Sequence, residues 1–170
     1  MSETITQISE YVVVKGIVDE DFVNYKVPSM FIATNECTFK CDKEYGEPIC
    51  QNSSLVRAKT YDVKIEDLVR RYLSNDITKA VVFGGLEPFD QYIEIYDFIS
   101  MLRYQHECLD PVVIYTGYNE SEIDGKVKFL SVIPNIIVKF GRFIPGQQRH
   151  YDEVLGVDLA SDNQYAKQIS

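Results

Sequence analysis

The sequence predicts an α/β fold, an open and partial (β/α) barrel of about six mostly parallel strands, formed by residues 1–170 as a single domain. Short apolar runs alternate with segments of helical periodicity, as in folds where helices cover a parallel sheet. The runs are almost continuously apolar, which is typical of strands buried on both faces. A closed barrel of eight βα units needs about 250 residues, so the 170-residue chain is expected to form only part of one.

The strand and helix candidates follow one another in alternation. Two stretches show the periodicity of amphipathic helices, Asp62–Ser74 and Gln91–Tyr104, and Asp90 is a plausible N-cap for the second. A short helix is expected to start near Asn119. The expected strands are Tyr11–Val14, Ser29–Thr34, Lys79–Phe83, Pro111–Tyr115 and Asn135–Phe140.

Polar or glycine-containing segments follow four of these strands. They are Asn35–Cys41, Gly84–Pro88, Thr116–Tyr118 and Gly141–Phe143. In parallel α/β folds, ligands bind at the carboxyl ends of the strands. The four segments are therefore expected to meet at one edge of the sheet and to form a binding site there.

Composition and charge exclude several classes of function. The formal net charge of −9 argues against a nucleic-acid partner, because binding phosphates requires a basic surface. The opening segment Met1–Glu10 is polar and predicts no signal peptide, and no stretch approaches the roughly 20 apolar residues of a membrane span. We expect no membrane partner and a cytoplasmic location, where the four cysteines would be reduced and available for metal binding or catalysis.

Three cysteines are the strongest chemical signal. Cys37 and Cys41 are separated by three residues, and Cys50 follows after eight more, all in the loop after an expected strand. Thiolates bind zinc or iron–sulfur clusters, and the spacing leaves three possibilities open: a cluster, a zinc site or unligated cysteines. A [4Fe–4S] cluster with three protein ligands keeps one iron open for a substrate. Cys108 is expected to be a small half-buried hydrophobic residue, with a fourth ligand as the alternative.

The segment from Gly84 to Pro88 is the second chemical signal. Glycines let a ligand approach the backbone, and backbone carbonyls together with the Glu87 carboxylate suit the α-amino group of an amino acid. The segment is neither a dinucleotide-binding fingerprint nor a P-loop, because the required glycine and lysine spacings are absent. A plain turn from strand to helix is the alternative interpretation.

These segments resemble the radical S-adenosylmethionine superfamily, and more narrowly the activating enzymes of anaerobic ribonucleoside-triphosphate reductase, over about Gly16 to Gln164. The family carries a three-cysteine loop after its first barrel strand, a Gly-Gly-Glu-Pro segment and a strand ending in Tyr-Thr-Gly-Tyr, similar to Tyr115–Tyr118. The reductase activators add Gly-Arg-Phe and Gly-Ser-Ser-Asn-Gln, similar to Gly141–Phe143 and Ala160–Gln164. The second cysteine gap is eight residues instead of two, Ile49 replaces an aromatic residue, and Leu86 is inserted before Glu87.

The resemblance implies a fold of the radical S-adenosylmethionine type and a [4Fe–4S] cluster on Cys37, Cys41 and Cys50. It implies reductive cleavage of S-adenosylmethionine to a 5′-deoxyadenosyl radical, which would generate a glycyl radical on a partner such as anaerobic ribonucleotide reductase. A flavodoxin- or ferredoxin-like donor would supply the electron. The cofactor-binding residues carried over by position are Ile49, Asn52, Gly84, Gly85, Glu87, Thr116 and Gly117, and no catalytic residue beyond the cluster ligands is implied.

Several alternatives remain open at this stage. Arg142, Asn163 and Gln164 would either dock the partner or cap loops. The chain could be a radical enzyme of the same fold with another substrate, or a non-catalytic iron–sulfur or zinc domain that binds a partner. A fold that keeps the core and has lost the cluster is a further alternative, given the long gap between Cys41 and Cys50.

Overall fold

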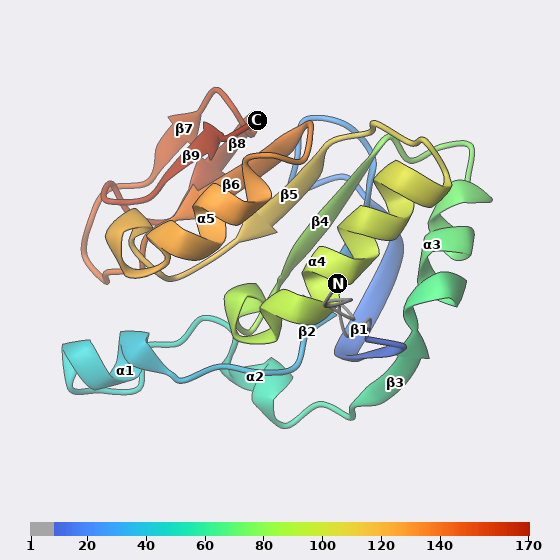
Figure 1. Cartoon of the computed structure of the whole chain (residues 1–170). Helices are drawn as coiled ribbons and strands as arrows, with labels where there is room; N and C mark the ends of the chain where they lie inside the picture. Colours follow the sequence, from blue (N-terminus) through green and yellow to red (C-terminus); the bar gives the residue numbers. More distant parts are fainter. Residues whose placement is uncertain (1–8) are drawn as a thin grey trace, which may run out of the picture.

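The computed structural model describes residues 9–170 and has a seven-stranded sheet at its centre (Figure 1). The strands of this sheet lie in the order β3-β1-β2-β4-β5-β6-β9, and β7 and β8 form a separate hairpin. The strands are β1 (Tyr11–Asp21), β2 (Ser29–Thr34), β3 (Tyr61–Lys64), β4 (Ala80–Gly85), β5 (Val112–Tyr115), β6 (Ile136–Phe140), β7 (His150–Asp152), β8 (Val157–Leu159) and β9 (Tyr165–Gln168).

The middle of the sheet is parallel and its margins are antiparallel. Pairs β2–β4, β4–β5 and β5–β6 are parallel, whereas β1–β2, β1–β3 and β6–β9 are antiparallel. The sheet is therefore more mixed than the sequence led us to expect. The carboxyl ends of β2, β4, β5 and β6 nonetheless lie along one edge, which is what a shared binding site requires.

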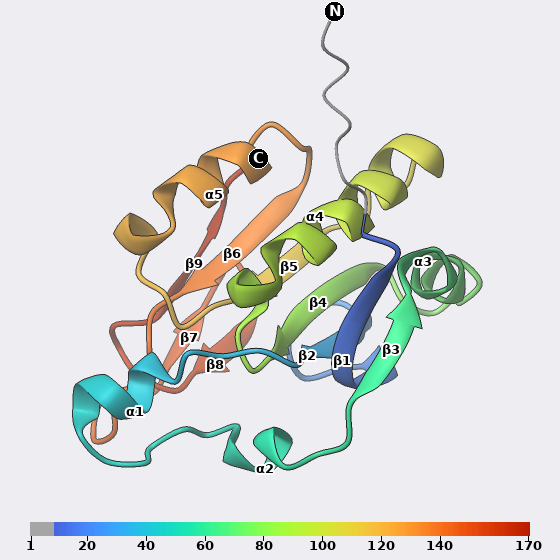
Figure 2. The same ribbon diagram turned by 60° about the horizontal axis from the view of Figure 1, so that its bottom comes forward.

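Three helices cover one face of the sheet (Figures 1 and 2). They are α3 (Ile65–Leu73), α4 (Tyr92–Ser100), which continues as the π-helical turn η2 (Met101–Gln105), and α5 (Asp124–Leu130). Their apolar residues, among them Leu68, Phe98 and Leu130, form one core cluster with inward-facing strand residues such as Ile32 and Val138. This burial is the main force that holds the helices on the sheet.

The opposite face is covered at its centre by the β7–β8 hairpin. Leu155 and Leu159 from this hairpin pack against Val82, Val113 and Ile137, which belong to adjacent strands. Because successive side chains of a strand point to opposite faces, the next row of the same face toward the carboxyl edge contains Gly84, Tyr115 and Lys139. Tyr115 and Lys139 are direct register partners.

The remaining short elements lie along the carboxyl edge. Helices α1 (Lys40–Tyr45) and α2 (Ser53–Val56) belong to the long segment after β2, drawn in cyan to teal (Figures 1 and 2). Two 3₁₀ turns follow β4 and β5, namely η1 (Pro88–Gln91) and η3 (Glu120–Glu122).

The secondary structure differs from the sequence prediction in three places. The predicted helix Asp62–Ser74 is wrong at its start, because Tyr61–Lys64 pairs with β1 as an edge strand and α3 begins at Ile65. Asp90 is not an N-cap, since it lies inside η1 and Glu87 caps that turn by accepting a hydrogen bond from the Phe89 N–H. Strands β7, β8 and β9 were not predicted, because they are short and carry few apolar residues.

Two sequence predictions concern targeting, namely the absence of a signal peptide and the absence of a membrane span. Most of the polar opening segment Met1–Glu10 lies outside the described residues. Within residues 9–170, no helix combines the length and the apolar character needed to cross a bilayer.

Gly85 fixes the geometry at the end of β4, which suggests a test. Its φ of +87° belongs to the left-handed region, and an added Cβ would lie 2.8 Å from the Ala33 Cα. We expect Gly85→Ala to lower the free energy of unfolding by about 1–3 kcal/mol, measured by urea denaturation. The control is Gly125→Ala, because Gly125 lies in α5 with open space around its Cα, and alanine there favours the helix by about 0.5–1 kcal/mol. Equal stability of the two variants would contradict the described strand end.

Candidate iron–sulfur centre

The segments expected to converge line one cavity at the carboxyl edge of the parallel strands. The cavity has a volume of about 310 Å³. Nine of the predicted site residues line it: Cys37, Cys41, Cys50, Asn52, Gly84, Gly85, Glu87, Thr116 and Gly117. We call it the central cavity. Loop residues that are distant in sequence therefore lie together, as the strand-end argument predicts.

Ile49 is the one predicted cofactor-binding residue that lies elsewhere. It lines a neighbouring cavity of about 430 Å³, which we call the side cavity. Cys41 and Phe143 line both cavities, so the two cavities adjoin at these residues. The other walls of the side cavity include Tyr45 from α1 and Ile144 from the segment after β6.

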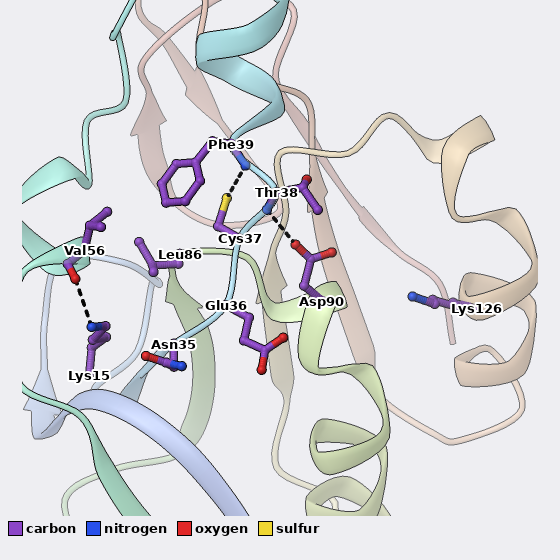
Figure 3. Close-up of a pocket in the computed structure, with 10 residues that line it drawn as sticks. All are labelled: Lys15, Asn35, Glu36, Cys37, Thr38, Phe39, Val56, Leu86, Asp90 and Lys126. Atoms are coloured by element: carbon purple, nitrogen blue, oxygen red, sulfur yellow. Dashed lines mark hydrogen bonds between the residues drawn. The ribbon is translucent and has the colours of Figure 1, made fainter.

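The first two cysteines are positioned by a tight turn into α1. Phe39 adopts a left-handed conformation with φ 54° just before this helix, and its N–H donates to the Cys37 Sγ at 3.2 Å (Figure 3). Cys41 lies in the first turn of α1. An added Cβ on Gly117 would be 3.7 Å from the Cys41 Sγ, so this thiol lies against the loop after β5.

Asp42 closes the eight-residue insertion that separates Cys41 from Cys50. Its Oδ1 accepts hydrogen bonds from the N–H groups of Ile49 and Cys50, both at 2.9 Å. The Asp42 backbone carbonyl accepts from the N–H of Gly46, whose φ of 83° ends α1. The insertion is thus a closed loop that returns the chain to Cys41, and the long gap in sequence does not separate the cysteines in space.

The third cysteine is also tied to the glycine segment. Asn52 Nδ2 donates to the Gly85 carbonyl at 2.7 Å, two residues after Cys50. Thr34, at the end of β2, donates to the Gly84 carbonyl at 3.0 Å. The glycine segment is therefore held from both ends of the cysteine loop.

Glu87 connects three of the strand-end loops. It is only 5% exposed, and its Oε1 accepts from the Thr116 hydroxyl at 2.8 Å and the Phe89 N–H at 3.0 Å. Its Oε2 accepts from the Gly117 N–H at 2.8 Å. The Glu87 N–H donates to the Glu36 carbonyl at 2.7 Å, one residue before Cys37. One buried residue thus joins the segments after β2, β4 and β5.

Two further residues of the same turn fasten the cysteine loop, and the sequence did not reveal their role. Asp90 accepts from the Thr38 N–H at 3.0 Å, shown in Figure 3, and from the Tyr118 hydroxyl at 2.6 Å. Gln91 Oε1 accepts from the N–H groups of Asn35 and Glu36. A cavity of about 630 Å³ lies on this side of the loop, with Lys15 and Lys126 at its margins (Figure 3).

The thiols lie in an environment that disfavours their charged form. Burial raises the pKa of Cys37 to about 11, and the negative charges of Glu87 and Asp90 act in the same direction. Burial also raises the pKa of Cys41, while the cations Arg142 and Lys139 oppose that shift. Thiolates here consequently need an additional positive charge, such as bound iron.

Lys139 is a residue of the cavity wall that the sequence prediction missed. Burial lowers its pKa to about 8, and the charges of Glu87 and Cys41 oppose this shift. The sequence contained a clue to this residue. Lys139 interrupts the apolar run of β6 two residues after the buried Ile137, and therefore on the same face of the strand. Gly141 and Gln164 also line the cavity.

Arg142, Asn163 and Gln164 are engaged within the chain. Arg142 forms ion pairs with Glu122 at 2.6 Å and Glu44 at 3.2 Å. Asn163 Nδ2 donates to the Arg142 carbonyl, and Gln164 Oε1 accepts from the N–H groups of Ala160 and Ser161. These contacts match the loop-capping alternative, and Arg142 and Asn163 also line the side cavity.

Cys108 lies at the opposite edge of the sheet from the other three cysteines. It precedes β5, at the amino edge of the parallel strands, and packs against the helix-side core. The cysteine loop follows β2 at the carboxyl edge. Cys108 therefore matches the expected half-buried hydrophobic residue.

Comparison with protein families identifies the class of the centre. The family model described as "4Fe-4S single cluster domain" matches residues 28–164, which is most of the chain. The chain belongs to this family. The prediction of a [4Fe–4S] cluster is thereby confirmed at the level of cofactor class. No curated protein and no solved structure matches the chain.

The residues of the iron–sulfur domain fit such a cluster. Three thiols, the ligand type that iron–sulfur clusters use, line one cavity next to a buried cation. The thiols do not converge on a point, since no group of three or more Cys, His, Asp or Glu in residues 9–170 could hold a single metal ion. A cluster suits this arrangement, because each of its thiolates binds a different iron.

The Asp42 contacts lead to a prediction about cluster binding. Asp42→Ala removes the acceptor for the Cys50 N–H, so the third ligand loses its fixed position. Loss of an outer hydrogen bond of this kind typically lowers metal affinity about 10- to 100-fold. We expect lower iron and sulfide content after anaerobic reconstitution and faster iron loss to a chelator. Asp42→Asn, which keeps one acceptor oxygen, should retain more iron. The control is Glu47→Ala in the exposed part of the same loop, and equal iron retention by Asp42→Ala and this control would refute the role of Asp42.

The Glu87 contacts lead to a prediction about stability. In Glu87→Gln, an amide NH₂ replaces one carboxylate oxygen, so the N–H of either Gly117 or Phe89 loses its acceptor. An unsatisfied buried donor costs about 1–3 kcal/mol, and we expect a loss of this size in urea denaturation followed by circular dichroism. Glu153→Gln, at an exposed position, should leave the stability unchanged. Unchanged stability in Glu87→Gln would mean that Glu87 does not join the loops.

Proposed function

We propose that this iron–sulfur domain is a radical S-adenosylmethionine enzyme that generates a glycyl radical on a partner enzyme, such as anaerobic ribonucleotide reductase. One observation carries the proposal. The three thiols, the Gly84–Gly85 backbone and the loop Thr116–Gly117 line a single cavity at the carboxyl edge of the parallel strands. A ligand in this cavity would contact the cluster and the glycine segment at the same time.

The fold supports the same proposal. Helices α3, α4 and α5 lie between consecutive strands of the parallel series and cover one face, as crossover helices of a (β/α) unit do. We propose that the antiparallel margins flank an open partial barrel. The three-cysteine loop follows β2, the first strand of the parallel series.

Cys37, Cys41 and Cys50 are the proposed cluster ligands. When bound, a [4Fe–4S] cluster with one open iron supplies an electron that cleaves S-adenosylmethionine into methionine and a 5′-deoxyadenosyl radical. The electron would come from a flavodoxin- or ferredoxin-like donor. The chain itself contributes a cavity walled by the sheet, the cysteine loop and the β7–β8 hairpin, which limits the access of water.

The hydrogen bonds of the glycine segment and of Glu87 support different roles for the two in ligand binding. Within the chain, Oε1 of the Glu87 carboxylate accepts two hydrogen bonds and Oε2 accepts one. We therefore assign Glu87 as a positioning residue that holds Thr116 and Gly117 against the glycine segment. The carbonyl of Gly85 accepts a hydrogen bond from Asn52 Nδ2, and a carbonyl oxygen has a second lone pair that an α-amino group can use.

The side cavity supports a protein substrate. It adjoins the central cavity at Cys41 and Phe143. Its further lining is part apolar and part polar: Tyr45, Ile49, Ile144, Glu44, Asn119, Arg142 and Asn163. Its volume of about 430 Å³ gives room for a short peptide segment. A backbone glycine on a loop of the partner could reach the central cavity by this route.

The decisive assay measures 5′-deoxyadenosine after anaerobic reconstitution and addition of S-adenosylmethionine and dithionite. We expect product from the wild type and from Cys108→Ala, whose cysteine lies at the opposite edge of the sheet, and none from Cys50→Ala. A full cluster complement without any 5′-deoxyadenosine would overturn the radical proposal and favour a non-catalytic iron–sulfur domain. Addition of a purified glycyl-radical enzyme, followed by electron paramagnetic resonance, then tests the partner.

A further inference from the structure

Lys139 interrupts an apolar face at the point where the central cavity begins. The row of side chains beneath it consists of Val82, Val113 and Ile137, which pack against the β7–β8 hairpin. In the next row, Lys139 pairs in register with Tyr115, and both line the central cavity. An apolar residue would extend the packing here, so a lysine at this position needs another reason.

The ammonium group of Lys139 is buried without a paired carboxylate. The residue is only 6% exposed, and its Nζ donates to the carbonyls of Gly141 at 2.8 Å and Thr116 at 3.3 Å. None of the ion pairs formed by residues 9–170 includes Lys139. Lysine is almost never fully buried unless it is paired, and an unpaired buried charge destabilises a protein by several kcal/mol.

The two carbonyls fix where this charge lies. They belong to the residues that follow β5 and β6, so they hold the Nζ at the carboxyl edge, the edge that also carries the cysteine loop. Lys139 lines the central cavity together with Glu87 and Cys41, and the charges of both act on it. Three hydrogens are available on the ammonium group, and the two carbonyls occupy two of them.

We propose that Lys139 supplies a fixed positive charge that partly offsets the negative charge of the thiolate-bound cluster and thereby raises the reduction potential of the cluster. Three thiolates carry more negative charge than an oxidised [4Fe–4S]²⁺ core neutralises, and uptake of one electron adds to the excess. A buried cation stabilises the reduced form more than the oxidised form, because the reduced form carries the larger negative charge. Net charge near the cluster is one of the factors that set such potentials.

The proposal rests on the family assignment and on the cysteine ligands, and it does not depend on cleavage of S-adenosylmethionine. Its test is the midpoint potential of the cluster, measured by dithionite titration with electron paramagnetic resonance, with no S-adenosylmethionine present. In Lys139→Met, we expect the ratio of reduced to oxidised cluster at a fixed potential to fall at least tenfold, which is about 59 mV for a one-electron couple. Lys139→Arg, which keeps the charge, should change the ratio much less.

Lys79→Met is the matched control. It removes the same charge from an exposed position beside the amino end of β4, at the opposite edge of the sheet. The midpoint should be unchanged in this variant. Iron and sulfide content, together with circular dichroism, would verify that each protein is folded and loaded before its potential is measured.

Three outcomes would overturn the proposal. The first is a loaded Lys139→Met protein with the midpoint of the wild type, and weakened binding of S-adenosylmethionine in that protein would make Lys139 an anchor for the ligand carboxylate. The second is the loss of folding in Lys139→Met, Lys139→Gln and Lys139→Arg alike, which would give Lys139 a purely structural role. The third is that the Met and Gln variants fold but do not load, whereas Arg loads, which would assign the charge to cluster binding instead of the reduction potential.

Discussion

The central cavity depends on the hydrogen bonds of one buried carboxylate. Glu87 is almost fully enclosed, and removal of its charge from water would be unfavourable without compensation. Three donors offset part of that cost: the Thr116 hydroxyl and the N–H groups of Gly117 and Phe89. Burial raises the pKa of Glu87 to about 7, and all three hydrogen bonds lower it. Because each donor belongs to a strand-end loop or turn, satisfying the carboxylate also fixes the positions of these loops.

The cysteine loop is built on the frame that Glu87 and its neighbours provide. Asp90 and Gln91 accept hydrogen bonds from backbone N–H groups on both sides of Cys37. Asp42 serves the same purpose for Cys50, at the other end of the loop. The backbone around the cysteines is thus held largely by acidic and amide side chains. A preformed loop of this kind lowers the entropic cost of ordering three ligands when a cluster binds.

The sequence allowed the parallel strands and many of the residues that line the central cavity to be predicted, because both depend on local patterns. Ser29–Thr34 is β2 with the bounds predicted, and the segments after the strands meet in one cavity because parallel strands end at one edge. The antiparallel margins could not be predicted in this way, since the pairing of β3 with β1 and of β9 with β6 depends on tertiary contacts between short polar segments. The role of Asp42 could not be predicted either. Its carboxylate accepts hydrogen bonds from the N–H groups of Ile49 and Cys50 only when the folded loop brings these residues back to it.

The charged side chains around the central cavity are distributed unevenly. Acidic groups act on Cys37 and cations act on Cys41, and the cations differ in whether a carboxylate pairs with them. Burial raises the pKa of both Cys37 and Cys41; Glu87 and Asp90 add to this shift at Cys37, whereas Arg142 and Lys139 oppose it at Cys41. Arg142 is itself paired with Glu122 and Glu44, so much of its charge is already balanced. Lys139 forms no ion pair among the described residues, and its hydrogen-bond partners are carbonyls, although the Glu87 charge also acts on it. A cluster held by three thiolates would add a second negative group beside this buried cation, which explains why a lysine occupies a strand position where an apolar residue would pack better.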